Sequence, residues 1–240
     1  MTGLPWDRTP VASSLLATRN PLVKLIVLFV VSIVVMFWFD PLRPGVLWAL
    51  LLVGTVVGAK ISPKALLVSQ LVFAGFALGT LLVNIVTRPN DPDALAIGFS
   101  LAFRTMAIGT ASVAFIASTD AVALVTSLHQ NGRLPARFAY SLLAGYRILE
   151  DLPREWALLA AAHGVRDPQQ RRPGAAALGR RAFALLVVSI RKGERLAQSL
   201  ELRGLERQPR TLWRPVVITP ADAAFACAVV AVVVGVWFLR

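Results

Sequence analysis

The sequence contains one cysteine, two histidines and 13 acidic residues in 240 positions. The single Cys227 excludes an intramolecular disulfide, and so few thiol and imidazole groups give no basis for a metal site. The sequence has no Walker A loop, no H-E-x-x-H and no G-x-S-x-G pattern. We therefore expect no catalytic residues, no metal site and no cofactor bound by this chain itself.

Charged residues are also scarce, at 16%, whereas 56% of the residues are hydrophobic and the mean hydropathy is +0.66. Such a composition is too apolar for an ordinary soluble domain and indicates a protein of the bilayer. A membrane-crossing helix needs roughly 17 to 25 mainly apolar residues. Five runs qualify or nearly qualify, at 22–39, 46–59, 65–86, 94–117 and 216–239. The sequence therefore predicts an all-α polytopic membrane protein with about five transmembrane helices.

The distribution of charge predicts the topology. Of the 25 basic residues, 16 lie in 133–214, where only seven of the 13 acidic residues lie. A basic excess beside membrane spans marks a cytoplasmic segment, and the N-terminal arm is basic as well. We therefore expect a multi-pass protein of the plasma membrane with a cytoplasmic N-terminus. Its parts would be a four-span membrane domain (1–117), a cytoplasmic coupling-helix domain (118–215) and a final transmembrane helix (216–240).

The cytoplasmic segment predicts two long amphipathic helices. Apolar or small residues recur at alternating steps of four and three, which keeps them on one helix face. Gly145 and Gly193 lie within these faces, where small residues let two helices cross closely. Apolar faces of this length favour docking onto a protein partner, and we expect no nucleic acid. The alternative is that these are nucleic-acid-binding or membrane-surface helices, for which a basic face is enough.

Polar and small residues stand out inside the spans. Arg104 lies midway along the fourth run, where an unpaired charge is costly, so it should face protein or water. It is either part of an ion pair or interface, or a snorkelling arginine of a tilted span. Gly54 with Gly58, and Gly75 with Gly79, form GxxxG pairs that permit close helix approach. Their partners are this chain's own spans or a second membrane protein.

Two matching patterns occur near the ends of the predicted amphipathic helices. Residues 199–205, S-L-E-L-R-G-L, resemble the A-x-E-A-R-G sequence that closes the second coupling helix in T components of energy-coupling factor transporters. Residues 160–165, A-A-A-H-G-V, resemble the first copy, usually A-Q-x-A-R-G. The two glycines, Gly164 and Gly204, are 40 residues apart, a spacing that agrees with the family.

Further patterns of the same family follow in order along nearly the whole chain. Residues 20–25 are similar to its D-P-R-x-K-L opening, 118–120 to its T-T-x-[DP] exit from the fourth span, and 219–222 to its [ST]-x-x-D entry to the last span. Arg104 matches a mid-span arginine, and Arg147, ahead of Glu150, resembles the R-F-x-P-x-x-x-x-E region.

The resemblance implies a noncatalytic T component of an ATP-driven importer. Its partners would be two ATP-binding cassette subunits, which carry ATP and Mg, and a membrane S component that binds a vitamin, a vitamin precursor or a transition metal ion. The implied ATPase-coupling residues are Ala162, His163, Gly164, Leu202, Arg203 and Gly204, and the implied structural or interface residues are Pro21, Lys24, Arg104, Asp120, Arg147 and Asp222.

His163 departs from the family pattern, because the first motif normally has arginine at this position. A histidine donates hydrogen bonds more weakly at neutral pH, so we expect the two ATPase contacts to be unequal.

Two other hypotheses belong to different classes. A membrane enzyme acting on a lipid or prenyl substrate would need convergent carboxylates, which only Asp120, Glu150, Asp151 and Glu155 offer, without a paired motif. A self-sufficient secondary transporter would be expected to show inverted repeats and broken spans, and the sequence shows neither.

Overall fold

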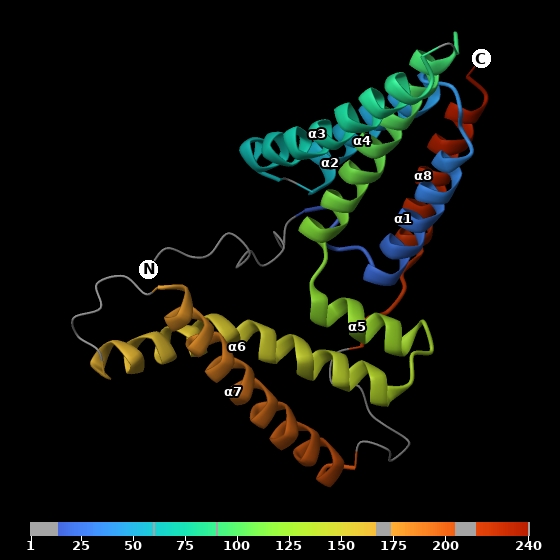
Figure 1. Cartoon of the computed structure of the whole chain (residues 1–240). Coiled ribbons are helices and arrows are strands. Elements are labelled where there is room, and N and C mark those ends of the chain that lie inside the picture. Colours follow the sequence, from blue (N-terminus) through green and yellow to red (C-terminus); the bar gives the residue numbers. More distant parts are fainter. Residues whose placement is uncertain (1–13, 60, 90, 167–173, 205–214, 240) are drawn as a thin grey trace. The chain divides into compact units, whose positions relative to one another are not determined.

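The computed structural model describes residues 14–59, 61–89, 91–166, 174–204 and 215–239. Within these ranges all regular secondary structure is helical (Figure 1), which confirms the predicted fold class. The helices are α1 (Pro21–Met36), α2 (Leu42–Ala59), α3 (Pro63–Thr87), α4 (Ala94–Ser118), α5 (Ala121–Gln130), α6 (Ala136–Arg166), α7 (Ala175–Leu202) and α8 (Pro220–Trp237).

The five predicted spans all form helices. Helices α2, α3, α4 and α8 are long and apolar enough to cross a membrane. Helix α2 starts at Leu42, four residues before the apolar run that predicted it, which brings it to 18 residues. Helix α1 has only 16 residues and is therefore about 24 Å long, less than the roughly 30 Å of a hydrocarbon core. The chain segment that follows α1 consequently has to be compatible with the membrane.

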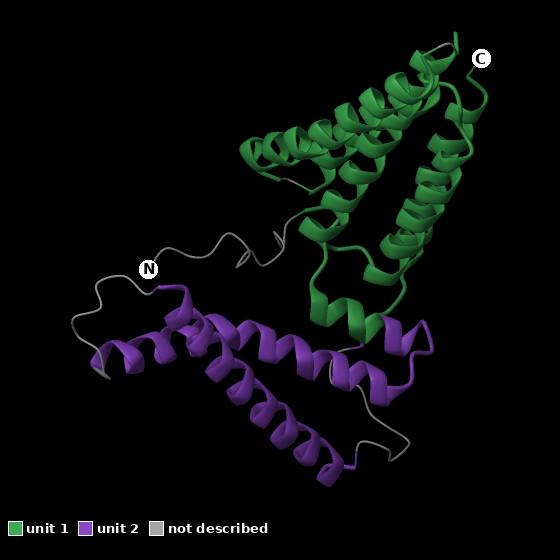
Figure 2. Ribbon diagram, viewed as in Figure 1, with its two compact units in different colours: residues 1–127, 216–240 green, residues 128–215 purple. Residues whose placement is uncertain are grey.

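The chain divides into two compact units, residues 1–127 with 216–240, and residues 128–215 (Figure 2). In the first unit α4 packs against α1, α2 and α3, and α8 packs against α1 and α2. A buried apolar cluster joins α1 and its C-terminal loop to α2 and α8, and consists of Val31, Val35, Trp38, Leu47, Val233 and Val236. The last helix of the chain thus completes a core that the first helix begins.

Glycines bring α3 and α4 together. A Cβ at Gly109 would lie 2.6 Å from the Phe73 ring, and one at Gly98 would lie 2.7 Å from Leu81. Both distances are shorter than real carbon contacts, so these positions tolerate no side chain without movement of the neighbour. Close α3–α4 packing depends on both glycines.

The GxxxG glycines behave differently from the glycines of the α3–α4 contact. Only Gly58 faces another part of the chain, with Leu16 at 2.9 Å from an added Cβ. At Gly54, Gly75 and Gly79 no described atom lies within 4 Å of the added Cβ. Among the described residues, the GxxxG pairs therefore meet this chain only at Gly58, and the residue there, Leu16, precedes α1 and belongs to no span.

The second unit contains two long crossing helices, α6 of 31 residues and α7 of 28 residues. Where they cross, Lys192 of α7 donates to Glu155 at 2.6 Å and lies 3.6 Å from Asp151, both on α6. An added Cβ at Gly193 would lie 4.0 Å from Ile148, so this glycine is at the crossing as predicted. Gly145 has no described atom within 4 Å of an added Cβ, so the same prediction is wrong at Gly145.

Candidate functional site

Buried polar side chains gather at one end of the first unit, where α1 and α8 begin and α4 ends. We call Asn20, Lys24, Ser118, Ser127 and Asp222 the polar junction. Each of them is at most 6% exposed. They belong to the start of α1, the end of α4, the middle of α5 and the start of α8. Residues up to 202 positions apart therefore share one hydrogen-bonded cluster.

Asp222 supplies the acceptors that join α8 to α1. Its Oδ1 accepts a hydrogen bond from the Asn20 backbone N–H at 2.9 Å. Its Oδ2 accepts from the backbone N–H and the hydroxyl of Thr219, each at 2.8 Å. A carboxylate at the third position of a helix that reaches back to the N-cap satisfies an otherwise unpaired donor and is favoured by the helix dipole. Residues 219–222 thus form the start of α8, and Asp222 also binds the residue that precedes α1.

Asn20 and Pro21 build the start of α1. Asn20 Oδ1 accepts from the Leu22 N–H at 2.9 Å and from the Ser127 hydroxyl at 2.6 Å. Pro21 occupies the first turn, where its missing N–H leaves no donor unsatisfied. Sequence reasoning did not single out Ser127, whose only signal is a small polar residue in an otherwise apolar helix.

Lys24 closes the other side of the junction. Its ammonium donates to the Ser118 carbonyl at 2.7 Å and to the Leu16 carbonyl at 3.0 Å. Since Ser118 ends α4, the positive charge lies at a helix C-terminus, where the helix dipole stabilises it. Asp120, two residues further, accepts from the Ala123 N–H at 3.0 Å and so caps α5 from an exposed position. Lys24 and Asp222 thus both belong to the polar junction but bind different partners, and Asp120 lies at the adjoining connection.

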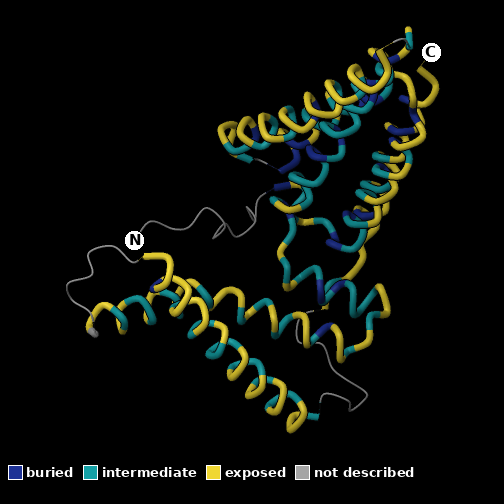
Figure 3. The backbone as a smooth tube through the Cα atoms, viewed as in Figure 1, coloured by how far each residue is buried: buried dark blue, intermediate teal, exposed yellow. Residues whose placement is uncertain are grey.

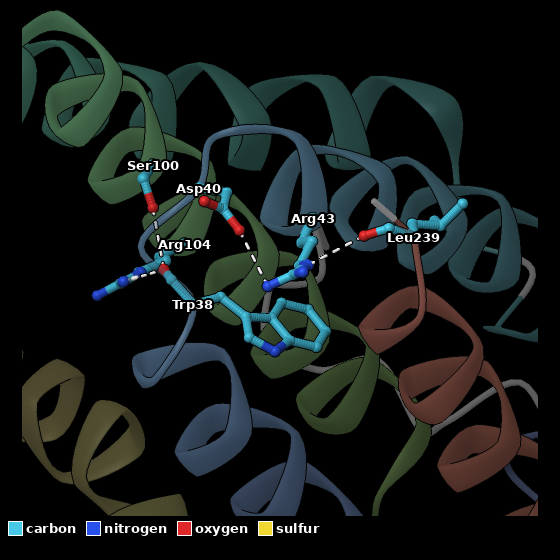
Figure 4. A network of polar contacts seen from close by, with 6 residues as sticks. All are labelled: Trp38, Asp40, Arg43, Ser100, Arg104 and Leu239. Atoms are coloured by element: carbon cyan, nitrogen blue, oxygen red, sulfur yellow. Dashed lines mark hydrogen bonds and ion pairs between the residues drawn. The ribbon is translucent and has the colours of Figure 1, made fainter. Parts of the chain in front are cut away.

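Arg104 lies in a second polar cluster, near the C-terminal end of α1 (Figure 4). Its guanidinium donates to the Trp38 carbonyl, which also accepts from the Ser100 hydroxyl at 3.1 Å. The same guanidinium lies over the Phe39 ring, 5.2 Å from its centroid. Beside it, Arg43 pairs with Asp40 at 2.9 Å.

The short length of α1 explains why an arginine stands in the middle of α4. Irregular backbone at membrane depth is tolerated only where other groups satisfy its carbonyls. Arg104 and Ser100 do this for Trp38, just beyond the last turn of α1. Among the described residues, Arg104 therefore binds a backbone carbonyl and not a carboxylate. The interface contact and the snorkelling side chain considered above stay predictions.

The end of α7 in the second unit exposes a cation beside an aliphatic side chain. Arg203 follows the last helical residue and is exposed, and Leu202 is 90% exposed. Gly204 has φ of 74°, and its N–H donates to the Glu201 carbonyl at 2.9 Å. A left-handed residue directly after a helix is a common stop that favours glycine. The motif thus ends the helix and presents Leu202 and Arg203 to solvent.

The end of α6 presents a related but unequal set. Ala162 and Gly164 are exposed, His163 is half-buried, and Val165 is 82% exposed. Gly164 remains helical, because α6 continues to Arg166. Arg147 is exposed on α6, well before this end of the helix. The structure therefore places the two motifs at the ends of two different helices, and Arg147 apart from both.

These features define a class: an all-α polytopic membrane protein in which a pair of long amphipathic helices is inserted before the last span. A family model described as "CbiQ: Cobalt transport protein" matches residues 12–212. The chain belongs to this family and is a component of membrane transport. The match covers α1 to α7, and α8 follows it. Among curated proteins none matches the chain.

Proposed function

We propose that this chain is the transmembrane coupling subunit of an ATP-driven importer of the energy-coupling factor type. Two partner ATPase subunits carry ATP and Mg, and this chain is noncatalytic and binds no cofactor. A partner S component in the plasma membrane binds the cargo, which is a vitamin, a vitamin precursor or a transition metal ion such as the cobalt in the family's description. The N-terminus and the second unit are cytoplasmic.

The observation that carries this proposal is the pair of helix ends in the second unit. Each end combines a side chain that can donate hydrogen bonds with a strongly exposed aliphatic one, Arg203 with Leu202 on α7 and His163 with Val165 on α6. An aliphatic side chain at a helix end gains free energy when a partner's groove covers it. The planar guanidinium beside it forms several charge-assisted hydrogen bonds to carboxylates or helix-end carbonyls. Such ends suit grooves on two ATPase subunits.

The polar junction offers a route for motion into the membrane helices. The chain leaves the first unit through α5 and returns just before α8, and both of these helices contribute to the junction. Asn20 accepts from Ser127 of α5, while its N–H donates to Asp222 of α8. A displacement of either helix therefore acts directly on the start of α1.

A groove on α3 supports a partner within the membrane. Its lining includes Gly75, Gly79, Thr80 and Asn84 of α3 and Leu101 of α4. The two glycines allow the backbone of a partner helix to approach closely, and the polar side chains offer hydrogen bonds in an apolar medium. This is the surface that we assign to the S component.

The proposal is tested by reversing the charge at the end of α7. We expect Arg203→Glu to abolish co-purification of co-expressed ATPase subunits and the ATP turnover of the assembled complex. Arg195→Glu is the matched control, because it makes the same charge change at an exposed position of the same helix. Full assembly and turnover with Arg203→Glu, or an equal loss with both variants, would contradict the proposal.

A further inference from the structure

The first half of α7 exposes a row of large apolar side chains. Phe183, Leu186 and Ile190 are 68%, 56% and 53% exposed. Their spacing of three and four residues places them on one face of the helix. In Figure 3 yellow exposed residues alternate with teal half-buried residues along α7. The start of α6 has a similar row, formed by Phe138, Leu142 and Leu149. These apolar faces are not covered by the described residues of the second unit.

Charge is distributed unevenly along the same two helices. Residues 175–193 of α7 contain three arginines and one lysine but no acidic residue, and residues 136–149 of α6 contain two arginines and again no acidic residue. All acidic side chains of both helices come later, at Glu150, Asp151, Glu155, Glu194 and Glu201. Arg180 and Arg191, which flank the apolar row of α7, are exposed. The first half of each helix therefore carries an exposed apolar row, and all of its charged residues are basic.

We propose that the apolar row of α7 lies in the headgroup layer of a bilayer that contains anionic lipids. An amphipathic helix with apolar residues on one face and arginines beside them binds such a surface, because the apolar face enters the acyl boundary and the cations meet the lipid phosphates. The chain passes from the first unit to the second within α5, which follows the span α4, and returns just before the span α8, so both connections are close in sequence to the end of a span.

The position of the acidic residues argues for this occupant over an ATPase. The proposed ATPase contacts lie at the last residues of α6 and α7, beyond the acidic residues, whereas the apolar rows lie before them. The lipid contact goes beyond the proposed function and does not depend on it. A second membrane protein is the competing occupant of the same face, and the experiment separates the two.

The test measures the depth of spin labels on the full-length chain in vesicles. Cys227→Ser serves as background, and one label is attached through Leu186→Cys. A control label is attached through Gln198→Cys, an exposed polar position of α7 that lies about 120° around the helix from Leu186. In phosphatidylcholine vesicles containing phosphatidylglycerol, we expect the first label to collide more with oxygen than with a water-soluble nickel complex. The control label should show the reverse, and Ile190→Cys provides a second label on the apolar row.

Lipid charge and salt decide the interpretation. We expect the Leu186 label to move toward water in vesicles of phosphatidylcholine alone, in 1 M salt, which shortens the screening length to about 3 Å, and in the Arg180→Gln, Arg191→Gln double variant. Water accessibility equal to that of the control in anionic vesicles would overturn the proposal. A depth of the Leu186 label that does not depend on lipid charge would also overturn the proposal. Protection of this label from water that appears only after a membrane partner is added would overturn it too, because the apolar row of α7 would then contact a protein.

Discussion

Replacing Asp222 by alanine tests the polar junction directly. The substitution removes the acceptors of three donors: the Asn20 N–H and the N–H and hydroxyl of Thr219. The Asn20 donor is the costly one, because Asn20 is 3% exposed and water does not replace the lost partner. A buried donor left without an acceptor costs about 1–3 kcal/mol, and the interrupted helix start of α8 adds about 1 kcal/mol. We therefore expect a loss of about 2–4 kcal/mol.

The measurement is equilibrium unfolding in mixed micelles, followed by tryptophan fluorescence. Asp222→Asn should lose about half as much, because it keeps one acceptor oxygen while its amide meets one of the donors. Asp120→Ala is the control, since it removes one bond from an exposed helix cap and should cost about 1 kcal/mol. If Asp222→Ala costs no more than Asp120→Ala, the junction does not hold α8 to α1 and the reasoning is refuted.

Two further predictions concern helix contacts. Gly109→Ala should lower the unfolding midpoint because its Cβ would meet the Phe73 ring at 2.6 Å, whereas Gly79→Ala, with no described atom within 4 Å, should leave the midpoint unchanged or raise it; equal losses would contradict this. The carboxylates of α6, above all that of Glu155, which accepts a hydrogen bond from Lys192, raise the pKa of Lys192 above its usual 10.5. The contribution of this raised pKa to stability is therefore fully present below pH 10.5 and is lost as the pH rises through the higher value. NMR of ¹³C-methylated lysines, with Lys192→Arg to assign the signal, should show a titration above 10.5, and a midpoint at or below 10.5 would refute it.

The spans and the helix ends could be predicted from the sequence because their causes are local. Apolar runs of sufficient length are a property of consecutive residues, and α2 differs from its run only because Leu42 to Gly45 extend the helix upstream. The stop of α7 at Gly204 follows from the glycine itself, which adopts a positive φ without a Cβ clash. The separate helix α5 was not predicted, because ten residues between two polar connections carry too short a periodicity.

The partners of the buried polar residues could not be predicted, because they come from distant parts of the chain or from the backbone. Arg104 donates to a carbonyl 66 residues away, and a carbonyl has no signature in the sequence. Ser127 meets Asn20 across 107 residues, which requires knowledge of how α5 lies against α1. Gly164 shows the converse limit, since it matches the motif of Gly204 yet remains helical.

The buried cluster shared by α1 and α8 has a consequence for biosynthesis. Val233 and Val236 belong to the last eight residues of the chain, and they cover Val31 and Val35, which leave the ribosome about 200 residues earlier. At about 5–20 residues per second, translation takes about 10–40 s to supply them. During that interval the apolar side of the first inserted helix lies against lipid or the insertion machinery, so a nascent chain arrested before its final helix should be a preferred target for membrane quality control.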